Sequence, residues 1–120
     1  MSLLRLKDAS LNQNEFHKIF KHIISRAVQI CPDIIISVFG SFTKNQFTAA
    51  SDLDISIIIP DSFSEKEFYI KLKKAGPLSV WPLDLVIINK ARFEKRKDYG
   101  EICFEINHSG VELYPDWRIS

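Results

Sequence analysis

Apolar residues recur every three or four positions near the start of this chain, the period that places them on one face of a helix. The pattern predicts a helix over Asn14–Ile30, which Cys31-Pro32-Asp33 would end. Asn12 and Glu15 are spaced like a capping pair for its first turn. The residues of the apolar stripe are Phe16, Ile19, Phe20, Ile23, Ile24, Ala27 and Val28.

Two later segments show the same helical spacing. Residues 64–77 open with a capping box of the form Ser-x-x-Glu and end at Gly76-Pro77, which stops a helix. The spacing of apolar residues over 98–108 predicts another helix, capped by Asp98 and ended by Gly110.

Four short runs rich in Ile, Leu and Val predict strands between and after these helices. The element order is therefore α-β-β-α-β-α-β. Because only residues 41–51 separate the first two strands, there is no room for a full crossover helix, and these strands are not expected to form a parallel unit. We predict an α/β (α+β) fold with a small mixed sheet and helices packed on it. The strand runs are residues 33–40, 52–60, 82–89 and 111–114.

Composition narrows the class of protein. A length of 120 residues suits one domain over residues 1–120, with residues 1–10 as a loosely packed lead-in. A net charge of +1 argues against a protein that holds nucleic acid by bulk electrostatics. No apolar run approaches the roughly 20 residues that cross a bilayer, and no signal-peptide core opens the chain, so we expect a cytoplasmic protein without a membrane partner.

The cysteines and tryptophans carry no recognisable site pattern. Cys31 and Cys103 are far apart and lack the spacing of a zinc site, so they are interpreted as buried thiols in a reducing compartment. Trp81 and Trp117 are interpreted as packing or interface residues.

Three aspartates stand where a strand would have to bury charge. Asp52 and Asp54 open the second strand run, and alternation would point both side chains to one face, about 6.6 Å apart. Asp84 interrupts the apolar third run, where a lone carboxylate would meet a desolvation penalty of several kcal/mol. If these two strands are neighbours, the three carboxylates can share a divalent metal ion.

A phosphate site is expected at the end of the first strand. Gly40 permits a sharp turn and a close ligand approach. Ser41 offers its hydroxyl, and backbone N–H groups follow at what would be a helix N-terminus. Lys44 adds a positive charge one turn later.

The order of these residues resembles the nucleotidyltransferase signature of the DNA polymerase beta-like superfamily. It consists of Gly40-Ser41, ten further residues, Asp52-x-Asp54 and a later Asp84. The short chain is most similar to the minimal nucleotidyltransferases. The resemblance implies that the three aspartates hold two Mg²⁺ ions and that Gly40, Ser41 and Lys44 bind the phosphates of a nucleoside triphosphate, with ATP as the expected donor. In-line attack of a hydroxyl on the α-phosphorus would transfer a nucleoside monophosphate and release pyrophosphate.

The same resemblance carries expectations about partners. Minimal nucleotidyltransferases often accompany a small helical HEPN protein, which implies that this chain is the antitoxin of such a pair and modifies its partner. A homo-oligomer is also compatible with the sequence. The alternative is a non-catalytic subunit that neutralises or positions a partner by contact.

The same residues allow other interpretations. The stretch Ser51-Asp52-Leu53-Asp54 could be a solvated turn. Dehalogenase-type phosphatases and Asp-x-Asp glycosyltransferases are disfavoured because here the apolar run follows the aspartates instead of preceding them. One departure from the family is Lys44-Asn45 where many relatives have Arg-Gly. Lysine loses the bidentate fork, and Asn45 can adopt a left-handed backbone conformation less freely than glycine.

Overall fold

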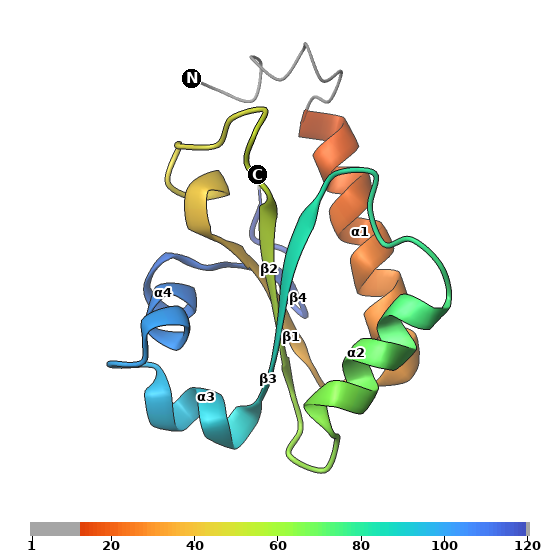
Figure 1. The fold of residues 1–120 in the computed structure, drawn as a ribbon, viewed down its shortest axis with the longest axis vertical. Coiled ribbons are helices and arrows are strands. Elements are labelled where there is room, and N and C mark those ends of the chain that lie inside the picture. The colour runs from red at the N-terminus through yellow and green to blue at the C-terminus, as the bar shows by residue number, and fades with distance from the viewer. Residues whose placement is uncertain (1–12, 120) are drawn as a thin grey trace.

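The computed structural model describes residues 13–119 and shows one four-stranded sheet with helices on both of its faces (Figure 1). The strand order is β3-β2-β1-β4; β1 is antiparallel to both β2 and β4, whereas β2 and β3 are parallel. The predicted mixed sheet is therefore confirmed. The strands are β1 (Ile35–Phe39), β2 (Leu53–Ile59), β3 (Leu83–Asn89) and β4 (Val111–Tyr114).

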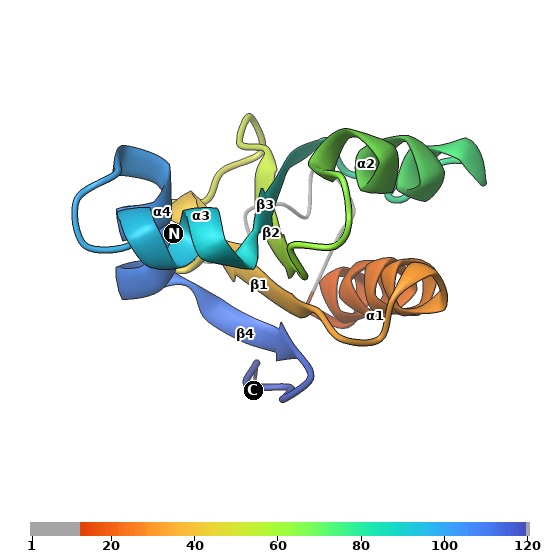
Figure 2. The same cartoon turned by 90° about the horizontal axis from the view of Figure 1, so that it is seen from below.

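The two faces of the sheet bury different sets of residues. Helices α1 and α2 cover one face, and α3 and α4 cover the other (Figures 1 and 2). Along β2, Leu53, Ile55, Ile57 and Ile59 enter the larger core under α1 and α2, because alternate side chains of a strand share a face. Asp54, Ser56 and Ile58 therefore face α3 and α4. The helices are α1 (Gln13–Ile30), α2 (Glu65–Lys74), α3 (Lys90–Arg96) and α4 (Glu101–Ser109).

The first two predicted helices are confirmed. The apolar stripe of α1 supplies the buried Phe16, Phe20 and Ile23, and the predicted start falls one residue from the observed one. The capping box of α2 forms as expected, because Ser64 Oγ accepts a hydrogen bond from the Glu67 N–H at 3.2 Å. The proposed cap Asn12 and the lead-in lie outside the described residues.

The C-terminal helices correct the sequence prediction. Helix α3 was not predicted, because Phe93 is its one buried residue and the periodic signal is therefore absent. Contacts from distant segments fix its start: Asp61 Oδ1 accepts from the Ala91 N–H at 2.9 Å, and Glu65 Oε2 accepts from the Asn89 N–H at 2.7 Å.

The helix expected from Asp98 also begins later. It starts at Glu101 with Gly100 as its N-cap and no side-chain cap bond, so the assignment of Asp98 as the cap is wrong. The Gly100 N–H instead donates to Arg96 O at 2.7 Å, which ends α3 and separates the two helices. The predicted end at Gly110 is confirmed.

Two further expectations concern cysteines and membranes. Both cysteines are buried free thiols, as predicted. Within residues 13–119, none of the helices combines the length and the apolar character that a membrane crossing requires.

Candidate active site

The sheet brings two of the three predicted aspartates together. In the parallel pair of β2 and β3, Asp54 lies directly opposite Asp84, so both side chains point to the face that carries α3 and α4. On its other side Asp54 lies opposite Phe39, the last residue of β1. Asp52 precedes the first residue of β2 and is exposed. The condition for a shared site, that the strands of Asp54 and Asp84 are neighbours, is therefore met.

Gly40 is required by its contact with Asp54. Its φ of +76° lies in the left-handed region. A Cβ added there would overlap Asp54 Oδ2 and would lie 2.9 Å from Asp54 Cγ. The absence of a side chain therefore lets the bend after β1 pack directly against the carboxylate.

Asp54 is the electrostatic centre of a group of acids that we call the acid cluster: Asp52, Asp54, Asp84 and Glu105. Its pKa is raised to about 6, first by burial and then by the negative charges of Asp84 and Glu105, by a hydrogen bond with Asp84, and least by Asp52. Asp84 itself is exposed at the edge strand β3, so the desolvation that the sequence suggested for Asp84 falls on Asp54 instead. At neutral pH these carboxylates repel one another, and that repulsion favours binding of a cation.

Glu105 is a fourth acid that sequence reasoning missed. It lies on α4, a helix that contacts the bend after β1, and its charge acts on Asp54. Its place in the sequence gives no signal, because its proximity to Asp54 depends on how α4 packs on the sheet.

Lys44 is next to the cluster and is bound to that fourth acid. Its Nζ lies 2.8 Å from Glu105 Oε2. The predicted contact of Lys44 with phosphate stays a prediction, since here a carboxylate holds the ammonium group.

The single helical turn for which the sequence has room after β1 is a 3-10 turn, Gly40–Phe42. The N–H groups of Thr43 and Lys44 donate to Gly40 O and Ser41 O within this turn, both at 3.2 Å, and so they are not available to a phosphate. A single turn also has little dipole, so the phosphate role of Ser41 rests on its local groups and remains a prediction. Asn45 adopts the left-handed conformation that asparagine can reach, with φ +57°.

Aromatic side chains fix the bend from the core side. The Phe42 ring lies 5.3 Å from Phe47 and 5.5 Å from Phe16, centroid to centroid. Phe16 and Phe47 also contact Trp81, at 5.3 and 5.6 Å. We call Phe16, Phe42, Phe47 and Trp81 the aromatic cluster. The packing role predicted for Trp81 is confirmed.

Trp81 also holds the segment that carries Asp52. Its indole Nε1–H donates to Ser51 O at 2.8 Å. One residue further, the Leu53 N–H donates to Pro82 O at 2.9 Å. The backbone on both sides of Asp52 is therefore tied to the approach to β3.

A divalent metal ion needs several oxygen donors close together, and the acidic side chains near Asp54 are the candidates. Within residues 13–119, no three His, Cys, Asp or Glu side chains are gathered tightly enough to form a metal site as they lie. Asp54 and Asp84 nevertheless lie opposite each other in the sheet, and the negative charge of Asp84 raises the pKa of Asp54. A hard cation prefers such oxygen donors and would relieve the repulsion between them. The residues fit a cation, and a ligand role for exposed Asp52 stays a prediction.

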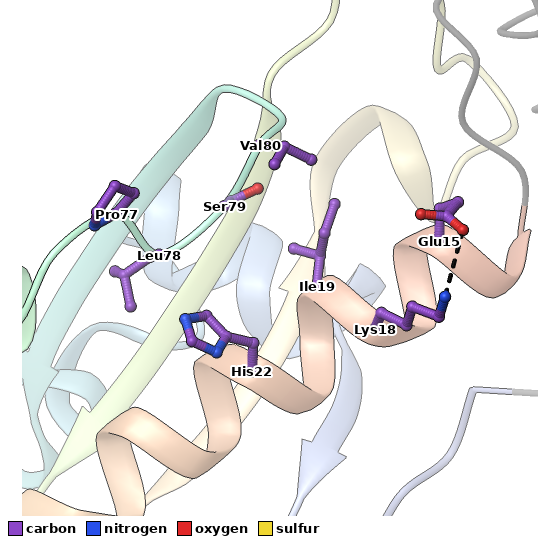
Figure 3. A pocket seen from close by; sticks show the side chains of 8 residues that line it. All are labelled: Glu15, Lys18, Ile19, His22, Pro77, Leu78, Ser79 and Val80. Carbon is purple, nitrogen blue, oxygen red and sulfur yellow. Dashed lines mark ion pairs between the residues drawn. The ribbon is translucent and has the colours of Figure 1, made fainter.

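A separate pocket of about 290 Å³ lies on the other side of the sheet (Figure 3). It is formed by α1 and the segment after α2, and Ile19, Leu78 and Val80 supply much of its apolar lining. The three aspartates do not line it, and Asp54 and Asp84 face the opposite side of the sheet. It is therefore not part of the acid site.

Comparisons with known proteins identify a family and a shared fold. A family model described as "Nucleotidyltransferase domain" matches residues 15–107. A crystal structure of a candidate nucleotidyltransferase from Sulfolobus solfataricus shares the fold, with a TM-score of 0.53 and 10% sequence identity over 88% of this chain and 90% of that one. Among curated proteins, no sequence matches this chain significantly. The predicted fold class is confirmed.

Proposed function

The chain belongs to the nucleotidyltransferase domain family, and from that premise we propose that it transfers a nucleoside monophosphate, AMP from ATP, to a hydroxyl group with the help of Mg²⁺. The single observation that supports catalysis by this chain is the placement of Asp54 opposite Asp84 and against the Gly40 bend. A protein that used the fold only for contact would not need a carboxylate, Asp54, whose pKa is raised by burial and by neighbouring acids in this way.

In this proposal Asp54, Asp84 and Asp52 hold the metal ions. When bound, divalent cations would neutralise phosphate charge and stabilise the entering and leaving oxygens of an in-line displacement. Gly40 lets the bend pack directly against the Asp54 carboxylate, and Ser41 would present its hydroxyl to the phosphates from the same bend. Asp84, exposed on the edge strand, orients the attacking hydroxyl or accepts its proton.

The acceptor would be presented by a second protein. Tyr99, Ile102 and Phe104 are exposed apolar side chains on or just before α4, the helix that also carries Glu105. A contact surface beside the acids suits a protein acceptor. We propose a tyrosine of a small helical HEPN-type toxin, which makes this chain its antitoxin; that identity rests on family resemblance.

The second candidate function is a subunit that neutralises its partner by contact alone. The same exposed side chains, Tyr99, Ile102 and Phe104, favour it, because they would bury apolar area in a complex with or without turnover.

One experiment separates the two functions. ATP labelled at the α-phosphate, Mg²⁺ and the genomic-neighbour protein are incubated with the wild type, with an Asp54→Asn, Asp84→Asn variant, and with Asp33→Asn as a control at an exposed position before β1. We expect label on the partner with the wild type and the control, and none with the double variant. Equal neutralisation by all three proteins without label would overturn the transferase and support the contact subunit.

A further inference from the structure

The ion pair between Lys44 and Glu105 joins the segment after the Gly40 bend to α4. Its Nζ–Oε2 distance is 2.8 Å, and the two side chains are 43% and 31% exposed. The other ion pairs that the structure shows in residues 13–119 do not involve the acids around Asp54. Among these ion pairs, the one between Lys44 and Glu105 is therefore the pair that brings a cation to the acid cluster.

The pair is not needed to build either element. Lys44 lies in a polar loop that is held by Phe42 and Phe47 in the core. Helix α4 is anchored by Cys103 and Ile106, which are buried in the second core. A partly exposed pair of this kind is weak and can be exchanged for a better partner.

A triphosphate is such a partner, since it brings several negative charges to one ammonium group. We propose that Glu105 is a positioning residue that holds Lys44 beside the acid cluster and releases it to the phosphates of an incoming nucleotide. Glu105 then remains as a further negative charge that attracts the divalent cation. This inference rests on the proposed nucleotidyl transfer and adds a role for Glu105 to it.

The proposal gives Glu105→Gln two effects of opposite sign. Lys44 loses its competing partner, so ATP in the presence of a chelator should bind about two- to five-fold tighter, the range set by a weak exposed ion pair. Mn²⁺ without nucleotide should bind more weakly, because one negative charge near Asp54 is gone. A merely structural defect would weaken both.

A second variant separates the two roles of Glu105. Glu105→Asp keeps the charge but shortens the side chain, so its carboxylate no longer reaches Lys44 in the observed geometry. We expect this variant to gain ATP affinity in chelator while Mn²⁺ affinity stays near that of the wild type.

The test uses calorimetric titration with ATP in chelator and electron paramagnetic resonance titration with Mn²⁺. Glu94→Gln is the matched control, since Glu94 pairs with Lys97 at 2.9 Å on α3 and should change neither affinity. In a Lys44→Gln background the gain in ATP affinity caused by Glu105→Gln should shrink, because the released partner is missing.

The outcomes are distinguishable from those of the proposed function. Wild-type binding of ATP and Mn²⁺ with unchanged affinities in Glu105→Gln would overturn the role of Glu105 alone. Loss of both affinities in a variant that still melts like the wild type would also overturn it. A wild type that binds neither ATP nor Mn²⁺ would overturn the nucleotidyl transfer itself, and this inference with it.

Discussion

The Gly40→Ala substitution tests whether the contact between the bend and Asp54 shapes the site. The added methyl group would overlap Asp54 Oδ2, and the φ of +76° would be strained for alanine. Strain of this kind costs roughly 1–3 kcal/mol, and overpacking adds roughly another 1–3 kcal/mol. We therefore expect a loss of about 2–6 kcal/mol in the free energy of unfolding, measured by urea denaturation.

Gly76→Ala is the control that isolates the overlap. Gly76 has a φ of +114°, yet a Cβ there would meet no atom within 4 Å. Alanine at this position is strained but not crowded, so its cost should stay near the roughly 1–3 kcal/mol of strain alone.

A double-mutant cycle with Asp54→Ala completes the test. That change removes Oδ2 and Cγ, and leaves Asp54 Cβ as the nearest of its atoms, 3.3 Å from the added methyl group. The cost of Gly40→Ala should then fall by most of its overpacking part. The reasoning is refuted if Gly40→Ala costs no more than Gly76→Ala, or if its cost is the same with and without the Asp54 carboxylate.

Three further substitutions have expected outcomes. Because the pKa of Asp54 is raised to about 6 in the fold and lies near 3.9 in an unfolded chain, wild-type stability relative to Asp54→Asn should fall as pH rises from about 4 to 6, and Mg²⁺ should restore it above that range. Chemical denaturation across this pH range checks it, and an unchanged difference would contradict the shift. Trp81→Phe removes the donor to Ser51 O and should cost about 1–3 kcal/mol while weakening Mn²⁺ binding, measured by denaturation and titration; unaltered Mn²⁺ affinity would show that Asp52 does not depend on this bond. Ser56→Ala should raise the melting temperature in calorimetry, because the buried Ser56 Oγ has no hydrogen-bond partner in the described structure; a lower melting temperature would reveal a partner.

Most of the fold could be predicted from the sequence because its main elements leave strong apolar patterns. The stripe of α1 has helical spacing and enters one core, whereas β2 and β3 are continuous apolar runs that bury side chains on both faces of the sheet. Helix α3 was missed for the opposite reason: it depends on Asp61 and Glu65 from elsewhere in the chain and buries only Phe93.

Only part of the candidate site could be predicted from the sequence. The spacing from Gly40 to Asp54 and the isolated Asp84 identified residues that the sheet register then placed together. Glu105 was missed because helix packing, not strand pairing, brings it near Asp54. The sequence has room for one helical turn after Ser41, and the structure has one there, the 3-10 turn Gly40–Phe42, whose Phe42 packs against the core.

The aromatic cluster has a consequence for how this domain can diversify. The rings of Phe42 and Trp81 both contact Phe16 and Phe47, so the bend beside Asp54 and the backbone that precedes Asp52 pack on the same aromatic cluster. Altering one of these rings would disturb the bend and the Asp52 segment together. We therefore expect new donor or acceptor preferences to arise at surface loop positions outside the aromatic cluster, where a change in the bend leaves the Asp52 segment intact and the reverse also holds.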